Sequence, residues 1–361
     1  MASNQFCIIM AGGIGSRFWP LSREEKPKQF VDALGIGKTF IQLTYERFSH
    51  FIPDENFLVM TGTGYKALVL EQLPMLHPEQ ILTEPCRRNT APCIAYAMFK
   101  LLRRNPHAVA VVTPSDQYIG HETSFSQVME ESLSYVATHP VLMTVGIAPT
   151  YPATGYGYIQ CKRECGQPFV PVLHFKEKPE LPTAARYLSE GTYYWNSGMF
   201  IWSVQTIAQA FRQHLPEVGS LFEQIQTYDT PMEQTDVNKA FEASPSISID
   251  YGIMEKASNV YVRCTDNLAW SDVGTWGALY GLLEKDEHEN SISGSYVSLS
   301  DANHNLIKET NPNKRVIVDG LSNYIIADTE DILMICPLGN EERIKELVKK
   351  GAEISSPQDK K

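Results

Sequence analysis

The chain has 361 residues, of which 43% are hydrophobic and 20% charged, a composition typical of a globular protein with one large domain and a smaller one. A net charge of −11 argues against a nucleic-acid partner, because duplex binding needs a basic surface. No long apolar run and no basic segment ahead of the first apolar run are present, so we expect no membrane partner and no signal peptide.

The first half of the chain alternates strand-like and helix-like segments. The apolar run 6–10 predicts a buried strand that ends in a glycine-rich loop. Thr39 and Gln42 form a capping-box pattern ahead of a helix. The alternation then continues through strand 57–60, helix 89–104, strand 108–113, helix 123–137 and strand 141–147. This order predicts an α/β protein built on a parallel sheet.

The second half is less regular up to residue 290. Its strand-like segments are 154–159, 172–179, 193–203 and 259–264, and helices are expected at 183–191 and 249–257. Beyond 290 come three short β-type runs, 314–320, 323–328 and 331–336, and a charged helix over 340–351. We therefore expect a catalytic domain over 1–290 and a small β-rich C-terminal domain with a terminal helix over 291–361.

Seven cysteines are scattered along the chain without a C-x-x-C pair. An odd number without such pairs is typical of reduced thiols, so we expect a cytoplasmic protein.

The most informative segment follows the first strand. It reads Ala11-Gly12-Gly13-Ile14-Gly15-Ser16-Arg17, with Lys28 a short distance beyond. Glycines directly after a strand let backbone N–H groups approach phosphates, and the two cations add positive charge.

Known phosphate motifs do not fit this segment. A dinucleotide fingerprint would need glycine at Phe18, and a P-loop ending in Gly37-Lys38-Thr39 would need glycine at Asp32. A kinase loop would need partner motifs that the chain lacks. The sequence thus predicts a phosphate-binding loop of another type.

A series of segments, in chain order, resembles one family. They are AGGIGSRFWPLSREEKPKQF (11–30), EPCRRNTAP (84–92), PSDQ (114–117), TGYGYI (154–159), FKEKP (175–179), NSGMF (196–200), SIDYGIMEK (248–256) and WSDVGTW (270–276). Together they resemble the mannose-1-phosphate guanylyltransferases of the sugar nucleotidylyltransferase superfamily, with Gln117 in place of the usual histidine. The resemblance implies a Rossmann-like, GT-A-like mixed sheet flanked by helices.

Long bacterial members of that family carry an isomerase domain with a metal-binding cupin at the C-terminus. The chain ends too early for such a domain, so we expect transferase activity alone.

The implied reaction joins GTP and mannose 1-phosphate, giving GDP-mannose and pyrophosphate with Mg²⁺ as cofactor. Asp116 and Asp272 are the expected metal ligands, because each follows an apolar strand and Mg²⁺ prefers one or two carboxylates plus phosphates and waters. Arg17 and Lys28 are expected to meet the triphosphate, which makes these four residues the expected catalytic group.

The resemblance also implies two binding groups. For the nucleotide they are Ala11, Gly12, Gly13, Gly15, Ser16, Arg17, Lys28, Glu84, Asn89 and Thr90, although Asn89 and Thr90 fit a helix cap equally well. For the sugar phosphate they are Gly155, Glu177, Lys178 and Asn196, the last hydrogen-bonding sugar hydroxyls through both ends of its amide.

Several alternatives stay open at this point. The sugar could be fucose or heptose 1-phosphate, or the nucleotide UTP, dTTP or CTP. A non-catalytic homologue that senses GDP-mannose would tolerate loss of the catalytic group, yet all four residues are present. A processive glycosyltransferase would normally show an Asp-x-Asp motif, and residues 114–117 hold a single aspartate. The resemblance leaves open a homodimer.

Overall fold

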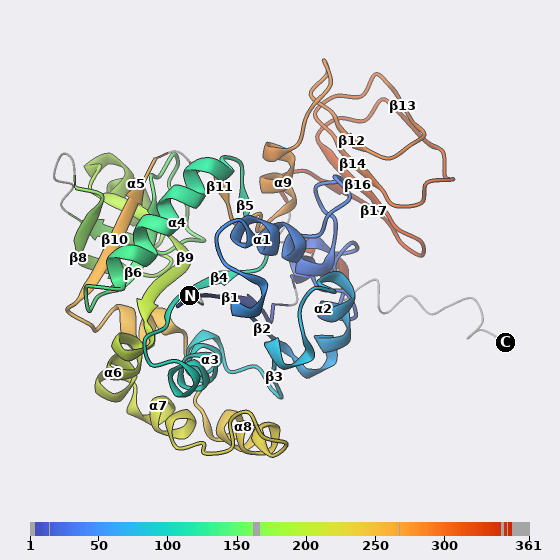
Figure 1. Ribbon diagram of the computed structural model, residues 1–361. Helices are drawn as coiled ribbons and strands as arrows, with labels where there is room; N and C mark the ends of the chain where they lie inside the picture. Colours follow the sequence, from blue (N-terminus) through green and yellow to red (C-terminus); the bar gives the residue numbers. More distant parts are fainter. Residues whose placement is uncertain are drawn as a thin grey trace. The chain divides into compact units, whose positions relative to one another are not determined.

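The computed structural model describes residues 4–13, 15–161, 167–266, 268–340, 343–344 and 346–348 (Figure 1). The expected terminal helix at 340–351 lies largely outside this part of the chain. The chain divides into two compact units. Unit 1 comprises Met1–Gly12, Thr44–Ser115 and Ile119–Trp270, and unit 2 comprises Gly13–Leu43, Asp116–Tyr118 and Ser271–Lys361.

Unit 1 is built on a nine-stranded sheet with the order β3-β2-β1-β4-β9-β6-β10-β8-β7. The strands are β1 (Gln5–Ala11), β2 (Phe57–Gly62), β3 (Ile81–Glu84), β4 (Val109–Pro114), β6 (Leu142–Ile147), β7 (Tyr158–Cys161), β8 (Phe169–Lys176), β9 (Tyr193–Ser203) and β10 (Val260–Thr265). Strand β1 lies parallel to β2 and β4, whereas β9 runs antiparallel to β4 and β6. The sheet is therefore mixed, as the family resemblance implied, and not wholly parallel as the alternation of elements alone suggested.

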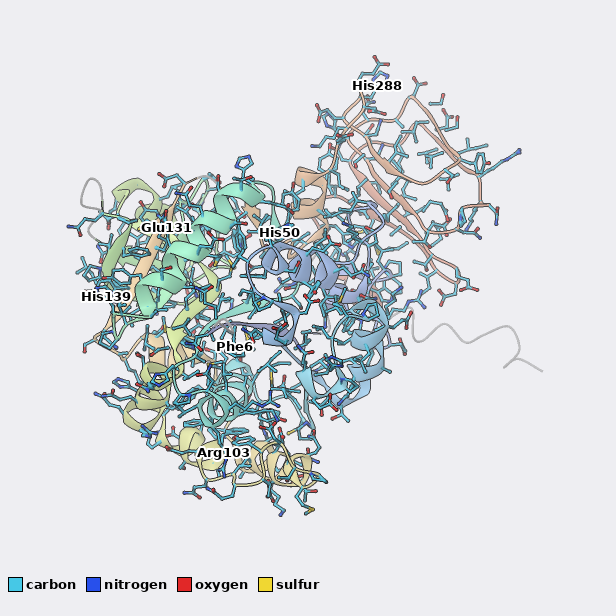
Figure 2. The ribbon with its side chains drawn as sticks, viewed as in Figure 1. Phe6, His50, Arg103, Glu131, His139 and His288 are labelled. Atoms are coloured by element: carbon cyan, nitrogen blue, oxygen red, sulfur yellow. The ribbon has the colours of Figure 1, made fainter. Side chains whose placement is uncertain are left out.

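Helices cover both faces of this sheet. They are α1 (Phe40–Ser49), α2 (Lys66–Gln72), α3 (Thr90–Arg104), α4 (Glu122–Val136), α5 (Leu181–Glu190), α6 (Val204–His214), α7 (Pro216–Glu223) and α8 (Glu233–Ala243), followed by a π-helical turn, Asp250–Met254, where an α-helix was expected. Because side chains alternate across a strand, Ile8 and Ala110 pack with α3, α6 and α7 on one face. The contacts of α4 are with β4, β6 and β9. Glu131 of α4, labelled in Figure 2, accepts a 2.9 Å hydrogen bond from Arg263 of β10.

Unit 2 contains two small sheets. One has the order β12 (Ser291–Ser293), β14 (Leu306–Glu309), β16 (Tyr324–Asp328) and β17 (Leu333–Pro337), and the other pairs β13 (Val297–Ser300) with β15 (Val316–Asp319). Strands β12, β14 and β16 are parallel, and β17 is antiparallel to β16. The two sheets share a core that includes Ile307, Val318 and Ile326. The three β-type runs of the C-terminal segment are confirmed as β15, β16 and β17.

A second core in unit 2 joins segments from the two ends of the chain. Phe18 and Leu21 of the glycine-rich segment pack with Trp276 of α9 (Trp276–Leu282) and with Ile325 and Met334 of the C-terminal strands. The glycine-rich segment therefore folds with the C-terminal strands.

The chain also forms a short strand pair, β5 (Tyr118–Ile119) with β11 (Trp270–Ser271). In the described part of the chain, no helix combines the length and the apolar character needed to cross a bilayer.

Candidate active site

The side chain of Lys28 contacts two other expected catalytic residues of unit 2, Asp116 and Asp272. It lies in the 3₁₀ turn Lys28–Phe30 and is only 5% exposed. Its Nζ donates to the backbone oxygen of Asp116 at 2.9 Å, to Oδ2 of Asp116 at 3.0 Å and to the backbone oxygen of Asp272 at 2.8 Å. A buried ammonium is costly unless it is paired and hydrogen-bonded, and here its three hydrogens have three acceptors. The fold thus joins residues as far as 244 positions apart.

Two aromatic rings complete the environment of this ammonium. The Nζ atom lies 5.5 Å from the ring centroid of Phe18 and 5.0 Å from that of Phe40. Both distances fall within the range of cation–π attraction. The ammonium of Lys28 is therefore held by three oxygen acceptors and lies beside two aromatic rings.

The two expected metal ligands differ in how they are held. The Asp116 side chain is 37% exposed and is paired with Lys28. Oδ1 of Asp272 accepts the backbone N–H of Gly274 at 3.0 Å. If a larger residue replaced Gly274, its Cβ atom would lie 2.6 Å from Oδ2 of Asp272. Glycine at that position therefore lets the carboxylate fold back over its own loop.

The glycine-rich loop packs tightly over Lys28. Gly15 has a φ of +64°, and a Cβ there would lie 2.3 Å from Cβ of Lys28. Its carbonyl oxygen accepts the hydroxyl of Ser22, and the carbonyl oxygen of Gly13 accepts Nε2 of Gln29 at 3.0 Å. Only glycine fits at position 15, both for backbone conformation and for space.

The remaining loop residues are more open. A Cβ at Gly13 would meet nothing within 4 Å, so its backbone is accessible to a ligand. Arg17 is exposed on the 3₁₀ turn Ser16–Phe18. Ile14 and the side chain of Ser16 lie outside the described part of the structure.

In unit 1, Glu84 ends β3 beside the glycine that follows β1. Its Oε1 would lie 3.3 Å from a Cβ at Gly12, so the carboxyl group meets the backbone of the loop. Burial raises the pKa of Glu84 to about 7, although a hydrogen bond from Cys93 and the charge of Arg87 act in the opposite direction. Its carboxyl group therefore changes charge close to neutral pH.

Replacement of Glu84 by glutamine will flatten the pH dependence of stability between the ordinary pKa of 4.5 and the folded value of about 7. In this window the folded protein keeps a proton that the unfolded chain has released, so the free energy of unfolding falls as pH rises. The contribution is on the order of 1–3 kcal/mol. Urea denaturation of wild type and Glu84→Gln at several pH values measures it, and parallel curves would show that Glu84 titrates normally.

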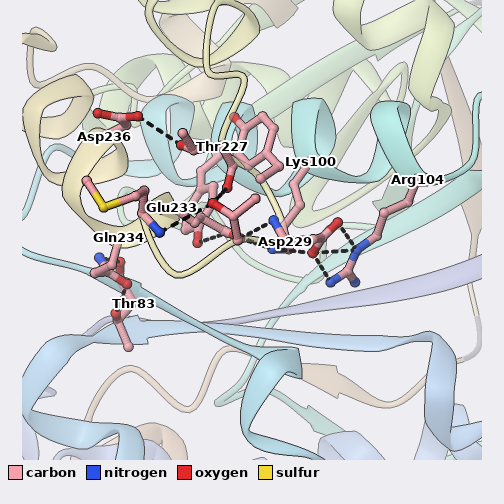
Figure 3. Close-up of polar contacts among 12 residues, drawn as sticks. Thr83, Lys100, Arg104, Thr227, Asp229, Glu233, Gln234 and Asp236 are labelled. Carbon is pink, nitrogen blue, oxygen red and sulfur yellow. Dashed lines mark hydrogen bonds and ion pairs between the residues drawn. The ribbon is translucent and has the colours of Figure 1, made fainter.

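A partly exposed polar network supports the end of β3 (Figure 3). Lys100 of α3 donates to Oε1 of Glu233 at 2.6 Å, at the start of α8. Next to it, Gln234 accepts the hydroxyl of Thr83 at 2.8 Å and donates to the carbonyl oxygen of Thr83 at 3.2 Å. Helix α8 is thereby tied both to α3 and to the residue that precedes Glu84.

Asn89 and Thr90 cap helix α3. Oδ1 of Asn89 accepts the backbone N–H of Thr90 at 2.9 Å, and Asn89 has a φ of +64°. Oγ1 of Thr90 accepts the backbone N–H of Ile249 at 2.9 Å. The helix-cap interpretation is therefore confirmed, and any contact with a nucleotide would come in addition to it.

The expected sugar residues of unit 1 form one polar cluster. Oδ1 of Asn196 accepts the hydroxyl of Thr144 at 2.9 Å and the N–H of Gly198 at 3.2 Å, while Nδ2 donates to Oδ1 of Asp250 at 3.0 Å. The amide oxygen thus already has two donors, and one amide hydrogen is left for a ligand. This differs from the expectation that both ends of the amide face a sugar.

A second carboxylate, Glu177, belongs to the same cluster. Its Oε1 accepts Nζ of Lys178 at 2.6 Å, and its Oε2 would lie 2.4 Å from a Cβ at Gly157. Gly157 is therefore required as glycine for Glu177 to lie where it does. Gly155, on the same turn, is exposed with open space around it.

The sequence interpretation missed one member of this cluster. Burial and, next, the charge of Glu177 raise the pKa of Asp250 to about 6, while Lys178 and the hydrogen bond from Asn196 act in the opposite direction. Two close carboxylates with one lysine nearby favour a ligand that donates hydrogen bonds. The segment SIDYGIMEK contained the signal for Asp250, but spacing alone could not link it to Asn196.

A comparison with protein-family models matches residues 6–289 to the nucleotidyl transferase family. The chain belongs to that family. Similarity to individual relatives covers nearly the whole chain. The chain is 34% identical, over 97% of its length, to the xanthan biosynthesis protein XanB of Xanthomonas campestris pv. campestris (strain B100), and the match covers 73% of that protein. It is also 34% identical over 94% of its length to the mannose-1-phosphate guanylyltransferase of Salmonella muenchen, covering 72% of that enzyme.

Solved structures agree on the fold of this nucleotidyl transferase. A crystal structure described as mannose-1-phosphate geranyltransferase from Thermus thermophilus matches with a TM-score of 0.86 and 30% identity, covering 97% of this chain and 100% of that one. A mannose-6-phosphate isomerase structure from Helicobacter pylori matches at 0.59 and 22% identity, over 74% of this chain and 99% of that one, which shows likeness of fold alone.

Within each unit of this nucleotidyl transferase, residues from separate motifs come together. Unit 2 joins Lys28 with Asp116 and Asp272. Unit 1 joins Asn196 with Asp250, and Glu177 lies near enough for its charge to act on Asp250. Such convergence of charged groups from distant motifs is typical of an enzyme site.

Proposed function

We propose that this nucleotidyl transferase transfers GMP from GTP to mannose 1-phosphate, giving GDP-mannose and pyrophosphate. The observation that carries the proposal is the buried ammonium of Lys28 held between Asp116 and Asp272. It is supported by the relatives named mannose-1-phosphate guanylyltransferase, each about a third identical over most of the chain.

The reaction needs little proton chemistry from the protein. An oxygen of the sugar phosphate attacks the α-phosphorus of GTP, a P–O bond forms, and the bond to pyrophosphate breaks on the opposite side. The nucleophile is already an anion, so the barrier lies mainly in bringing two polyanions together and stabilising charge in line. Positively charged side chains held in place serve this purpose. The buried ammonium of Lys28 is one such cation, and the exposed guanidinium of Arg17 is a second cation.

The donor set around Lys28 fits Mg²⁺. Asp116 and Asp272 offer two carboxylates, and the described residues contain no cluster of three or more ligating side chains. Mg²⁺ commonly takes one or two carboxylates and completes its shell with phosphate oxygens and waters. We infer that these two residues would hold the ion, which would supply charge stabilisation on the reacting phosphates.

For the nucleotide, we propose a division of roles. The backbone of Ala11, Gly12, Gly13, Gly15 and Ser16 would meet the phosphates, with Arg17 and Lys28 as cations. The ionised Glu84 would accept hydrogen bonds from the donor edge of guanine, since a carboxylate is an acceptor only. Asn89 and Thr90 would shape this base site as the cap of α3.

For the sugar phosphate, we propose that Lys178 meets the phosphate and Glu177 accepts sugar hydroxyls. Asn196 would act mainly by holding Asp250, and Gly155 would leave room for close backbone approach. Asp250 joins the set as a second acceptor. A polyhydroxyl ligand would supply further hydrogen-bond donors to these two carboxylates, in addition to Lys178 and Asn196.

Pyrophosphate release with GTP, UTP, dTTP and CTP against mannose, glucose, fucose and heptose 1-phosphates tests the proposal. We expect GTP with mannose 1-phosphate to give the highest kcat/KM. A higher value with UTP or dTTP would contradict the guanylyl assignment, and a higher value with another sugar would contradict the mannosyl assignment.

A further inference from the structure

We propose that the C-terminal strands of unit 2 are a positioning element for Lys28, because they hold the chain segment on both sides of this lysine. The inference rests on the proposed role of Lys28 in phosphate chemistry. It assigns a catalytic contribution to strands that the family match, which ends at residue 289, does not reach.

The first anchor lies ahead of Lys28 in the chain. The guanidinium of Arg23 donates through Nη1 to Oδ2 of Asp331 at 2.7 Å and through Nη2 to Oγ1 of Thr329 at 3.0 Å, with Nη2 also 2.5 Å from Oδ1 of Asp331. Both acceptors belong to the turn between β16 and β17. An exposed ion pair is usually weak, but this bidentate contact with a third partner is geometrically restrictive.

Arg23 is fixed on its own side as well. Its Nε donates to the carbonyl oxygen of Pro20 at 3.1 Å, and its backbone pairs with that of Lys26 at 3.0 Å and 3.2 Å. The hydrogen bonds from Arg23, together with its positive charge, lower the pKa of Asp331 to about 2. The turn at 329–332 and the loop that leads to Lys28 are thus one hydrogen-bonded assembly at neutral pH.

The second anchor follows Lys28. The carboxylate of Asp32 accepts backbone N–H groups of Gly35, Ile36 and Gly37 at 2.7, 3.1 and 2.7 Å. This is the stretch whose Gly-Lys-Thr ending resembled a P-loop. Its N–H groups are occupied by the protein's own carboxylate, so the stretch acts as a closed turn.

This closed turn rests on strands β12 and β14. Gly35 has a φ of +75°, and a Cβ there would lie 2.8 Å from Oγ of Ser293 and 3.2 Å from Nζ of Lys308. The buried Lys308 donates to Oγ of Ser293 at 3.0 Å, and the charge of Asp32 opposes the lowering of its pKa by burial. A buried ammonium facing the turn's carboxylate favours a fixed position for the turn.

A shared core joins the two anchors. Phe18 and Phe40, whose rings flank the ammonium of Lys28, pack in the same core as Ile325 and Met334 of β16 and β17. A shift of these strands would therefore move the rings as well as both ends of the loop. A small displacement of a catalytic group is costly, because reaction rate depends steeply on alignment.

Kinetics at the first anchor test the proposal. We expect Asp331→Asn to lower kcat about 10-fold while the KM for each substrate changes by less than about 3-fold. The charge swap Arg23→Asp with Asp331→Arg should recover a large part of kcat relative to either single change. The matched control is Glu223→Gln, which breaks the exposed bidentate pair between Arg212 and Glu223 in unit 1 and should leave kcat unchanged.

The second anchor gives an independent test. Gly35→Ala, which brings a Cβ against Ser293, should also lower kcat, whereas Gly320→Ala, with a similar φ of +69° and open space, should not. Each kcat is normalised to the concentration of folded protein and is measured well below the melting temperature of that variant. If Asp331→Asn and Gly35→Ala match their controls in kcat while Lys28→Met is inactive, the positioning role is refuted and the proposed function stands. If Lys28→Met keeps its activity, both the positioning role and the proposed function lose their support.

Discussion

Asparagine at Asp116 or at Asp272 will reduce kcat by about 100-fold or more, because each change removes one of the two carboxylate charges proposed to hold Mg²⁺. The structure makes the two variants unequal in stability. Asp116 supplies the carboxylate that pairs with Lys28, whereas Asp272 reaches Lys28 through its backbone oxygen. Asp116→Asn should therefore melt at a lower temperature, and Asp272→Asn should melt close to wild type.

The double variant decides whether the two aspartates act through one ion. Groups that serve one ion are non-additive, so the double variant should be little worse than the poorer single variant. Measurements of kcat against Mg²⁺ concentration, with a thermal melt of each protein, give the answer. Losses that multiply, or near-normal turnover in either single variant, would show that the pair does not share a metal.

Methionine at Lys28 will lower kcat by about 100- to 1,000-fold, the range seen when one pre-positioned charge-stabilising group is removed. Methionine keeps a long apolar side chain beside Phe18 and Phe40 but loses the ammonium that lies near their rings. Arginine should not restore activity, because Gly15 packs directly over Lys28 and leaves little room for a planar guanidinium.

The exposed neighbour Lys26 supplies the control for this experiment. Lys26→Met removes a positive charge two positions away without touching the buried group, so its kcat should stay within about 2-fold of wild type. Steady-state kinetics with GTP and mannose 1-phosphate compare the variants. Equal losses in Lys26→Met and Lys28→Met would point to the overall charge of the loop and away from the placed ammonium.

Several features of this protein follow from its sequence alone. The glycines around residue 15 specify a loop that only glycine can form, and Asn89 ahead of an apolar helix specifies a cap. Both depend on local backbone geometry, which residue type determines directly. The same kind of local signal predicted the strands β15 to β17. The roles expected for Arg17, Lys28, Asp116 and Asp272 came instead from the resemblance of their motifs to one family.

The partners of these residues were decided by the tertiary structure. Asn196 binds Asp250 because Thr144 of β6 and Gly198 of β9 orient its amide, and no spacing in the chain encodes that pairing. Likewise, Arg23 meets Asp331 across 308 positions, so the N-terminal loop folds with the C-terminal strands. Contacts at such separation depend on strand order, register and core packing, which arise only when the whole chain buries its apolar surface.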